Sequence, residues 1–401
     1  MEINPSSIVN ILTLRYDPSI KTNLPNKTSN DFKTTIDSPN ISEIENSICN
    51  YINQKLEKFN DKKISIALSG GVDSTLVLSL LRKIKPDIDI EAISIKFPEG
   101  IDETNDAAKI AKKFNAHHHI ITLDNYLSEL PKAISIIKMP FWDLHWYYVV
   151  KESKKLSKIL VSGDGGDELF AGYTFRYEKF LSLTSENSTP MEKVNSYLQC
   201  HERDRVPDQE KIFNEKSNFS WESIHNLLLP YFDNNLSRLE QVFLADYNGK
   251  LLYNFNPINS IIAKNFDIEL LTPLLNSDLI SISSHIKKSE KYDQIHNLGK
   301  LPLRRILEQN NHHSLVGQKK LGFNVNTINL WKKNAHKLCK EYLIDSRIVK
   351  DGWVSDIWIQ KYIDSQSLDI RYINKFLGIL AFEIWYRIFV TKEMDSNSTL
   401  D

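Results

Sequence analysis

The chain has 401 residues, of which 41% are hydrophobic and 25% are charged, and this ordinary globular composition excludes a disordered, collagenous or coiled-coil protein. The length is enough for two or three domain-sized cores. Fifty Lys and Arg against 51 Asp and Glu leave a formal net charge of -1, so we expect no nucleic acid and no anionic membrane as partner.

The cysteines and the chain ends favour a cytoplasmic protein. The three cysteines lie far apart and form no CxxC pair, which argues against a zinc ribbon, an iron–sulfur centre or a disulfide framework. The first residues lack the basic and apolar regions of a targeting peptide. Residues 376–390 are apolar but too few for a bilayer span and include Glu383 and Arg387, so they predict a buried amphipathic helix.

The first elements in chain order are an arm and a helix. Residues 1–40 are rich in Asn, Ser, Thr and Pro, which predicts an irregular arm that packs on the rest of the chain. Ser42 and Glu45 have the spacing of a capping box, and apolar residues then recur at helical spacing up to Phe59. The sequence therefore predicts that the first helix starts near residue 41.

Strands and helices then alternate up to about residue 180. ISIAL at 64–68 has the pattern of a buried strand, SGGVDST follows it, and LVLSLLRKI continues as a helix. The same alternation is repeated by EAISIKF, ETNDAAKIAKKF, HHHIITL and the strand before SGDGGDE. This order predicts an α/β domain over residues 41–180, with a parallel sheet flanked by helices.

The second half of the chain has a different pattern. Beyond about Tyr173 the strand signals fade and long helical patterns dominate, interrupted by prolines. We expect a mostly helical portion over residues 181–392. The last residues, 393–401, contain SNST and are expected to form a flexible tail.

The first candidate for chemistry is the loop SGGVDST at 69–75. Paired glycines between a strand and a helix present backbone N–H groups and the positive helix end to one spot, which predicts an anion site. The loop differs from the GxxxxGK[ST] phosphate loop because no Lys follows and Asp73 lies inside it. A carboxylate beside phosphate needs a cation, so Asp73 indicates Mg²⁺. The alternative is a capped strand-to-helix turn without a ligand.

The second candidate is the loop SGDGGDELF at 162–170, which also follows a short apolar strand. Its glycines and carboxylates cost entropy and repel one another unless a cation offsets them. In a parallel sheet both loops lie at the carboxyl ends of strands, where ligands bind. Asp73 and Asp167 are therefore predicted to share one Mg²⁺ with a polyphosphate. The alternative is an acidic loop unrelated to the first, although it lacks the ligand spacing of an EF-hand.

These two loops carry a family resemblance. SGGVDST resembles the pyrophosphatase loop of ATP pyrophosphatases that form adenylates, and SGDGGDELFAGY resembles the matching loop of the asparagine synthetase family. Further matches follow in the same order: Ile95 after the second strand, LTPLLN at 271–276, Lys300 to Arg304, and KKLGF at 319–323. Over residues 10–390 the chain is similar to the synthetase half of glutamine-dependent asparagine synthetases, and the resemblance implies an adenine nucleotide alpha-hydrolase-like fold.

The resemblance also implies a mechanism and roles for residues. A substrate carboxylate attacks the α-phosphate of ATP, pyrophosphate leaves with Mg²⁺, and ammonia displaces AMP from the acyl-adenylate. Lys300 is implied to reach the α-phosphate, and Asp73 and Asp167 to bind Mg²⁺. The residues implied to hold ATP are Ser69, Gly70, Gly71 and Ser74 for pyrophosphate, Leu68, Ile95, Ser162 and Gly163 for adenosine, and Asp73 as a ligand of the Mg²⁺ that accompanies the phosphates.

Two departures from the family pattern concern the acceptor. Where relatives often have Glu in the second loop, implied to handle a proton or the acceptor amine, this chain has Asp164, which is one methylene shorter. The segment at 254–276 lacks most charged residues of the matching family segment, which helps to shape the acceptor pocket. We expect aspartate as the acceptor and asparagine as the product, and another carboxylate remains the alternative.

The nitrogen donor is expected to be ammonia. Family members with a glutaminase half begin with Cys after the initiator Met, whereas this chain begins Met1-Glu2, so we expect no glutamine hydrolysis by that route. Ammonia is then either free or supplied by a separate glutaminase subunit. We favour the subunit because LTLRYDPS at 12–19 resembles the segment that follows the glutaminase half in the family.

Several other sequence features could suggest a metal site, a base-stacking site or a different function, but the sequence supports these interpretations less well. The three residues His117, His118 and His119 alternate across a strand and cannot all bind one metal ion. The aromatic group at 141–148 could stack on a base, but helical aromatics more often belong to the core. Lys319 and Lys320 could screen pyrophosphate or lie on the surface. A tRNA-modifying ATP pyrophosphatase is a rival function, which would predict a basic surface or a catalytic CxxC that this sequence lacks.

Overall fold

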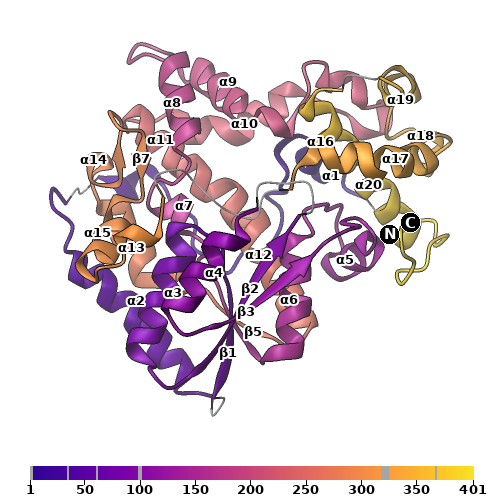
Figure 1. Cartoon of the computed structure of the whole chain (residues 1–401). Coiled ribbons are helices and arrows are strands. Elements are labelled where there is room, and N and C mark those ends of the chain that lie inside the picture. The colour runs from indigo at the N-terminus through magenta and orange to yellow at the C-terminus, as the bar shows by residue number, and fades with distance from the viewer. Residues whose placement is uncertain (1–2, 34–35, 60–61, 98–101, 318–324, 366–367) are drawn as a thin grey trace.

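The structure is a computed structural model of the chain (Figure 1). It describes residues 3–33, 36–59, 62–97, 102–317, 325–365 and 368–401. A sheet with helices on both faces forms one part, and a larger set of helices lies over one end of it. The N- and C-terminal ends lie near each other at the helical side.

The central sheet is parallel throughout. Within the described residues its strands have the order β3-β2-β1-β4-β5, and every neighbouring pair is parallel. The register places Ile66 of β1 beside Ala92 of β2 and beside Val161 of β4. The strands are β1 (Lys63–Ala67), β2 (Asp89–Lys96), β3 (His117–Thr122), β4 (Ile159–Val161) and β5 (Glu269–Leu271).

Alternation along the strands produces two cores, one on each face. Ile64 and Ile66 of β1 face a cluster that includes apolar side chains of α2, α3 and α4. Ala67, Ile93 and Leu160 belong to a second cluster, shared with α5, α6, α12 and the helical half. Because successive residues of a strand point to opposite faces, short apolar strands like these serve both cores.

The α-helices of the first half are α1 (Pro5–Leu14), α2 (Ile41–Leu56), α3 (Val72–Ile84), α4 (Thr104–Lys113), α5 (Leu130–Ile137), α6 (His145–Leu156), α7 (Gly166–Leu169) and α8 (Thr174–Leu183). Of these, α3, α4, α5 and α6 lie between successive strands along the chain, whereas α1 and α2 precede β1. The second half adds α9 (Pro190–Cys200), α10 (Trp221–Phe232), α11 (Arg238–Asp246), α12 (Asn256–Asn265), α13 (Ser277–His285), α14 (Lys288–Lys291), α15 (Leu301–Gln309), α16 (Thr327–Leu330), α17 (His336–Leu343), α18 (Arg347–Lys350), α19 (Asp356–Ile363) and α20 (Ile370–Phe389).

Short segments complete the element list. A two-stranded antiparallel hairpin joins β6 (Tyr292–Asp293) to β7 (Leu298–Gly299) directly before α15. The 3₁₀ and π segments are η1 (Ser29–Phe32), η2 (Glu202–Asp204), η3 (Gln209–Ile212), η4 (Glu215–Ser217), η5 (Tyr247–Phe255), η6 (Pro273–Leu275), η7 (His313–Leu315) and η8 (Trp331–Ala335).

The predicted fold class is confirmed, with two corrections in detail. The parallel sheet flanked by helices and the mostly helical second half are both present. The fifth strand, β5, was not predicted because its three residues carry no period of their own and it pairs with β4 more than a hundred residues earlier in the chain. The helix predicted to start near residue 41 is α2, the second helix, and it is capped by the side chain of Asn40, which accepts from the N–H of Glu43, rather than by Ser42.

Residues at both ends of the chain are buried against the rest of the molecule. The arm contains α1, whose N-terminus is capped by Asn4 and whose residues from Ile8 to Leu14 are buried. The sequence pattern did not predict this helix because the polar residues Asn10 and Thr13 interrupt the apolar pattern, although both are buried in the structure. At the other end, within the tail predicted over residues 393–401, Leu400 is buried and its N–H donates to the carbonyl of Ser128 at 2.9 Å.

The predicted buried helix near residue 380 is α20. Nearly all of its residues from Ile373 to Tyr386 are buried, including Glu383. Glu383 accepts hydrogen bonds at 3.0 Å from the backbone N–H groups of Arg347 and Ile348, which satisfies a charge inside the core. None of the helices described here is both long enough and apolar enough to pass through a bilayer.

Candidate active site

The first loop links β1 to α3 at the carboxyl end of the sheet. Its turn is held by hydroxyl groups: Ser74 Oγ lies 3.1 Å from Ser69 Oγ, and the N–H of Gly71 donates to Ser69 Oγ at 3.2 Å. Gly71 is the N-cap of α3 with φ −86°, so the paired glycines do not use left-handed backbone here. Asp73 lies in the first turn of α3, where the N–H groups and the helix dipole point at the same space.

The second loop links β4 to α7 beside the first. Gly165 has φ +93°, which only glycine adopts without strain, and a Cβ there would lie 2.2 Å from Leu275 Cδ2. Ser162 extends the pairing with β5, since its N–H donates to the carbonyl of Leu271 at 2.9 Å. Asp164 and Asp167 follow within this turn, so both carboxylates start from the end of β4.

The two loops are in direct contact. A Cβ on Gly163 would lie 2.9 Å from the backbone of Asp73, and a Cβ on Gly166 would lie 2.3 Å from Asp73 Oδ1. Distances this short mean that only glycine lets the second loop approach the Asp73 side chain. The structure thus brings the Asp73 and Asp167 loops together at one edge of the sheet, as their positions after parallel strands indicate.

Lys300 lies between the two aspartates. Its Nζ is 2.5 Å from Asp73 Oδ2 and 2.8 Å from Asp167 Oδ1, and the side chain is 9% exposed. Burial by itself lowers the pKa of Lys300, but Asp167 and Asp73 outweigh it and hold the pKa above its ordinary value. Lys300 therefore places a buried positive charge between two carboxylates that are 94 residues apart in the sequence, counted from 73 to 167.

Asp164 of the second loop contacts a helix of the second half of the chain. Its Oδ2 accepts a hydrogen bond at 2.9 Å from Asn259 of α12, the helix within the segment that departs from the family pattern. Burial raises the pKa of Asp164 above the ordinary value, while the hydrogen bonds from Asn259 and Ser162 act in the opposite direction. Asn259 was not identified from the sequence, because an asparagine among several in 254–265 gives no local signal.

The residues expected to hold adenosine lie at the ends of neighbouring strands. Leu68 continues β1, with its N–H donating to the carbonyl of Ile93 at 2.8 Å. Ile95 lies within β2, paired with Ile121, rather than after the strand as expected. Ser162 and Gly163 follow β4, so the expected nucleotide residues all lie along one edge of three adjacent strands.

A hydroxyl–imidazole pair supports the end of β1. Ser94 Oγ donates to the carbonyl of Leu68 at 2.7 Å and lies 2.8 Å from His118 Nε2. His119 faces the other way, with Nε2 at 2.5 Å from Glu91 Oε2. The three histidines at 117–119 therefore begin a strand and alternate across it, as the sequence predicts, and Ser94 is a residue that sequence reasoning missed.

Other sequence features fall outside the site. Trp146, Tyr147 and Tyr148 are buried in the helical core on α6, which fits their interpretation as core aromatics. Lys319, Lys320 and the rest of KKLGF at 319–323 lie outside the described residues. Arg304, four residues after Lys300, extends from α15 and donates from Nε to the carbonyl of Gly299 at 3.1 Å.

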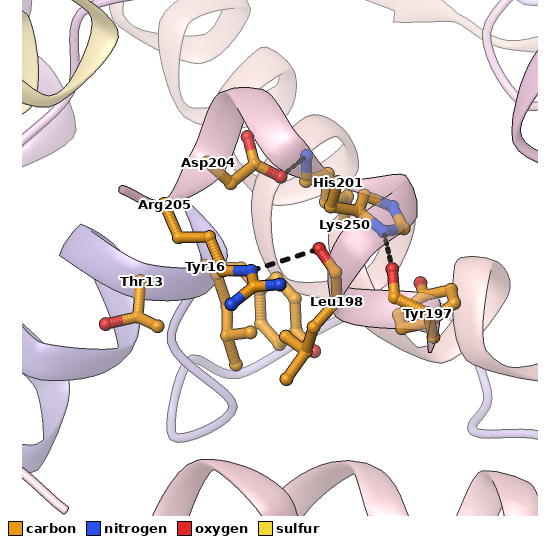
Figure 2. A pocket seen from close by; sticks show the side chains of 9 residues that line it. Thr13, Tyr16, Tyr197, Leu198, His201, Asp204, Arg205 and Lys250 are labelled. Atoms are coloured by element: carbon orange, nitrogen blue, oxygen red, sulfur yellow. Dashed lines mark hydrogen bonds and ion pairs between the residues drawn. The ribbon is translucent and has the colours of Figure 1, made fainter. Parts of the chain in front are cut away.

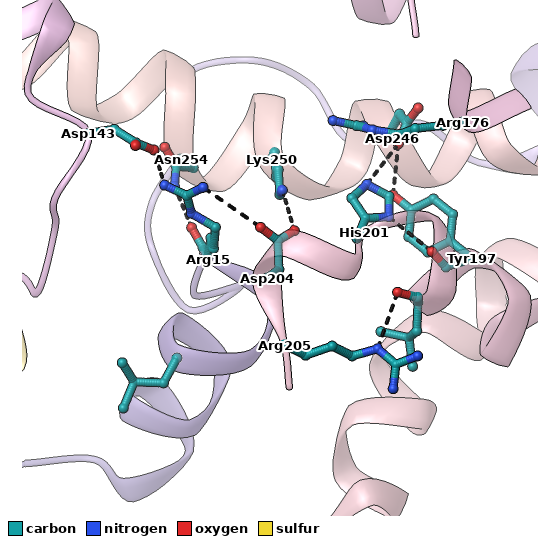
Figure 3. A network of polar contacts seen from close by, with 12 residues as sticks. Arg15, Asp143, Arg176, Tyr197, His201, Asp204, Arg205, Asp246, Lys250 and Asn254 are labelled. Carbon is teal, nitrogen blue, oxygen red and sulfur yellow. Dashed lines mark hydrogen bonds and ion pairs between the residues drawn. The ribbon is translucent and has the colours of Figure 1, made fainter. Parts of the chain in front are cut away.

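A second group of polar side chains lies behind the second loop, and it was not predicted. Figure 3 shows Arg176 and His201 converging on Asp246, with Arg176 Nη1 and His201 Nε2 at 3.4 and 3.7 Å from Asp246 Oδ1. The Arg176 guanidinium stacks at 3.8 Å on the ring of Tyr173, and the Tyr173 hydroxyl donates to Glu168 of the second loop. This buried charge group therefore supports the loop that carries Asp167.

The charge group continues to the end of α1. Arg15 contacts Asp143 and Asp204, and Lys250 also pairs with Asp204 (Figure 3). Burial favours protonation of Asp204, but Lys250 and Arg15 outweigh it and lower its pKa to about 2. A small cavity lies beside these residues (Figure 2). The residues that line it include Thr13, Tyr16, His201, Asp204, Arg205 and Lys250.

Comparison with known proteins places this geometry in a family. The family model described as asparagine synthase matches residues 55–387. Asparagine synthetase [glutamine-hydrolyzing] 1 of Bacillus subtilis (strain 168) is 25% identical to the chain, covering 88% of this chain and 60% of that protein. A putative asparagine synthetase [glutamine-hydrolyzing] of Mycobacterium bovis is 23% identical, with 82% and 55% covered. The chain thus spans little more than half the length of these relatives.

Solved structures give weaker matches. An NH3-dependent NAD synthetase from Campylobacter jejuni has a TM-score of 0.25 and 18% identity, covering 34% of this chain and 62% of that one. An NMN synthetase from Francisella tularensis has a TM-score of 0.28 and 16% identity, covering 53% and 94%. Scores this low carry no argument about the chain. The family model, in contrast, covers both loops and Lys300 within residues 55–387, and the chain belongs to the asparagine synthase family.

Proposed function

We propose that the chain is an ATP-dependent, AMP-forming amide synthetase that converts aspartate to asparagine through a β-aspartyl-adenylate and ammonia. The observation that carries this proposal is the placement of Lys300 between Asp73 and Asp167, 2.5 and 2.8 Å from their carboxylate oxygens, where two strand-end loops meet. Opposed carboxylates, a mobile cation and a helix N-terminus are what cleavage of a triphosphate requires.

The first loop is assigned to the phosphates. The N–H groups around Gly70, Gly71 and Ser74 would hold the pyrophosphate end of ATP, supported by the dipole of α3. Leu68, Ile95, Ser162 and Gly163 would hold adenosine along the strand ends, largely through backbone groups. The chemistry then rests on positioning and charge stabilisation, because the attacking group is the carboxylate of the substrate.

Mg²⁺ fits the donor set at the meeting point of the loops. The described residues contain no group of three or more His, Cys, Asp or Glu side chains arranged to hold a metal. Asp73 and Asp167 nevertheless suit Mg²⁺, which commonly binds through one or two carboxylates together with substrate phosphates and water. When bound there it would neutralise the negative charge of the leaving pyrophosphate.

Lys300 and Asp164 are assigned to the two chemical steps. The Lys300 ammonium, on a flexible four-carbon chain, would follow the negative charge that develops on the α-phosphate during attack. The Asp164 carboxylate, held by Asn259, would take up the proton that ammonia loses as it attacks the acyl carbon and AMP leaves. Since Asn259 belongs to α12, the same segment would shape the pocket for the acceptor.

The nitrogen source and the compartment follow from the same proposal. Ammonia is the attacking species, either free or delivered by a separate glutaminase subunit, which we favour. The three cysteines are free thiols, two of them buried, which supports a reducing cytoplasm as the place of this step of amino-acid biosynthesis.

The test is a stoichiometric assay. Purified protein with Mg²⁺, ATP, aspartate and ammonium should release AMP and pyrophosphate in step with asparagine. Asp73→Asn and Lys300→Ala should each reduce kcat/KM by orders of magnitude, because both remove charge stabilisation that exists only along the reaction path. A panel of other carboxylates in place of aspartate tests the alternative acceptor. Steady ADP production, or AMP release that is indifferent to every acceptor, would contradict the proposal.

A further inference from the structure

We infer that the Lys300 ammonium, which contacts both Asp73 and Asp167, competes with a divalent cation for these two carboxylates, so that the metal binds both of them only when Lys300 is displaced. The inference rests on the proposed function, because it concerns the regulation of the magnesium site assigned to Asp73 and Asp167. It makes metal binding by the protein alone weak and couples it to the arrival of a polyphosphate.

The geometry of the ion pairs is the first observation. The Nζ atom of Lys300 is 2.5 Å from Asp73 Oδ2 and 2.8 Å from Asp167 Oδ1, so one ammonium bridges both loops. A divalent cation that bound both carboxylates would have to lie in the space that this nitrogen holds. The ammonium and the metal therefore compete for the same oxygen atoms.

The backbone around Lys300 keeps the ammonium in place. Lys300 has φ +60°, a left-handed conformation that is uncommon for a lysine, and its N–H donates to the carbonyl of Phe170 at 2.9 Å. A Cβ on Gly172 would lie 1.9 Å from Asp167 Oδ1 and 2.4 Å from Lys300 Cε. The segment at 170–172 thus fixes the start of the Lys300 side chain and leaves just enough space for its end.

The exchange follows from charge balance. The Lys300 ammonium contributes a positive charge between two carboxylates in a partly buried place, and its removal would increase the repulsion between them. When a triphosphate binds, it adds negative charge to the site, and both the Lys300 ammonium and the divalent cation are then needed to balance the total negative charge. Lys300 would then move toward the phosphates on its flexible side chain, and Asp73 and Asp167 would hold the metal ion.

The test measures Mn²⁺ binding by calorimetry or electron paramagnetic resonance in the absence of nucleotide. Lys300→Met should bind Mn²⁺ at least roughly tenfold more tightly than the wild type, because the competing charge is gone. The variant should also unfold at a lower temperature without metal and regain stability when Mg²⁺ is added. The wild type should change little under the same addition.

Two further variants separate competition from a general loss of positive charge. Arg304→Met removes a neighbouring cation of α15 whose charge interacts with Asp73, and it should change Mn²⁺ affinity far less than Lys300→Met. Lys300→Gln removes the charge but can still donate hydrogen bonds to the carboxylates. It should also bind Mn²⁺ more tightly than the wild type, so it provides the same test if Lys300→Met does not fold.

The outcomes distinguish this inference from the proposed function. Equal Mn²⁺ affinity of the wild type and the Lys300 variants, or an equal gain for Arg304→Met, overturns the inference. The proposed metal site would survive if Mn²⁺ still bound the wild type together with α,β-methylene-ATP, which cannot release pyrophosphate. No Mn²⁺ binding to any of the proteins, even with this nucleotide, overturns both.

Discussion

Single residues at the meeting point of the loops are constrained by space and by charge. Gly163, Gly166 and Gly172 each stand where a Cβ would come within 3 Å of Asp73, Asp167 or Lys300. Gly165 adds a backbone conformation that other residues rarely adopt. Close approach therefore explains Gly163 and Gly166 of the second loop and Gly172 just after it, and a left-handed turn explains Gly165.

Gly172→Ala tests the close approach. A Cβ at this position would collide with Asp167 Oδ1 and Lys300 Cε, so both groups must shift. We expect kcat/KM to fall by about 100-fold, since displacements of about 1 Å at a reacting centre have effects of that size. The matched control is Gly317→Ala, where a Cβ meets no atom of the described residues within 4 Å, and it should retain activity. Full activity of Gly172→Ala would contradict the geometry described here.

Asn259→Leu tests the assignment of Asp164. The hydrogen bond from Asn259 favours the ionised carboxylate, so its removal raises the pKa of Asp164 further above the ordinary value. If ionised Asp164 takes up a proton, the acid limb of the kcat/KM profile should move to higher pH. Ile261→Ala, on an exposed position of the same helix, is the control and should leave the profile unchanged. An unmoved acid limb in Asn259→Leu would argue against the role of Asp164.

At the scale of elements, the second loop is held from behind by helices of the other half of the chain. α8 follows this loop, and its Arg176 lies between Tyr173 and Asp246, the last residue of α11. Tyr197 of α9 donates its hydroxyl proton to Asp246 at 2.8 Å. The sheet half and the helical half are thus joined through buried charges directly behind Asp167, not only through apolar packing.

Arg176→Met should destabilise the protein strongly. It leaves Asp246 buried without its cation, and breaking a buried pair in this way costs about 3–5 kcal/mol. Chemical denaturation should show a lower free energy of unfolding with an unchanged dependence on denaturant. Arg305→Met is the comparison, because the pair of Arg305 with Glu290 is partly exposed and should be worth about 1 kcal/mol or less. If the two variants lost similar amounts of unfolding free energy, the buried pair of Arg176 and Asp246 would contribute no more to stability than the exposed pair.

At the scale of the whole molecule, buried lysines connect distant parts of the chain through carbonyl groups. Lys375 of α20 donates to the carbonyl of Leu12 in α1 and, at 2.8 Å, to that of Asp204. Burial lowers its pKa from the ordinary 10.5 to about 7. Lys27 in the arm donates to the carbonyl of Ile280 at 2.5 Å, and burial lowers its pKa to about 7 as well.

These lysines predict how stability depends on pH. Above pH 7 the folded chain gives up the proton of Lys375 while the unfolded chain keeps it up to about pH 10.5, so the unfolded state binds more protons. The free energy of unfolding should therefore rise between pH 7 and 9, by about 1.4 kcal/mol per pH unit for each such proton.

Lys375→Met should reduce that slope by one proton, measured by urea unfolding at pH 7, 8 and 9. Lys337→Met removes an exposed lysine of α17 and should keep the wild-type slope. A stability that falls with rising pH over this range, or an unchanged slope in Lys375→Met, would contradict the protonation state inferred for this lysine.

The sequence predicted those parts of the molecule whose signals are local. Strand, loop and helix follow one another within about 20 residues from Ile64 to Ile84, and the period of apolar residues defines each element there. Alternation of such units implies parallel strands, and parallel strands imply that their loops share an edge. The positions of Asp73 and Asp167 beside each other were therefore predictable from the order of these local patterns.

Contacts between distant segments required the tertiary structure. Three features have no signal in the nearby sequence. They are the strand β5, the hydrogen bond from Asn259 to Asp164, and the buried charges around Asp246. Only the family resemblance predicted that Lys300 belongs to the candidate site, because its local sequence pattern is that of a surface lysine before a helix. Its bridge to Asp73 spans 227 residues, and only the packing of the hairpin and α15 against the second loop decides which charge meets which. Periodicity reports neighbours a few residues apart, whereas such pairs depend on how whole elements are placed.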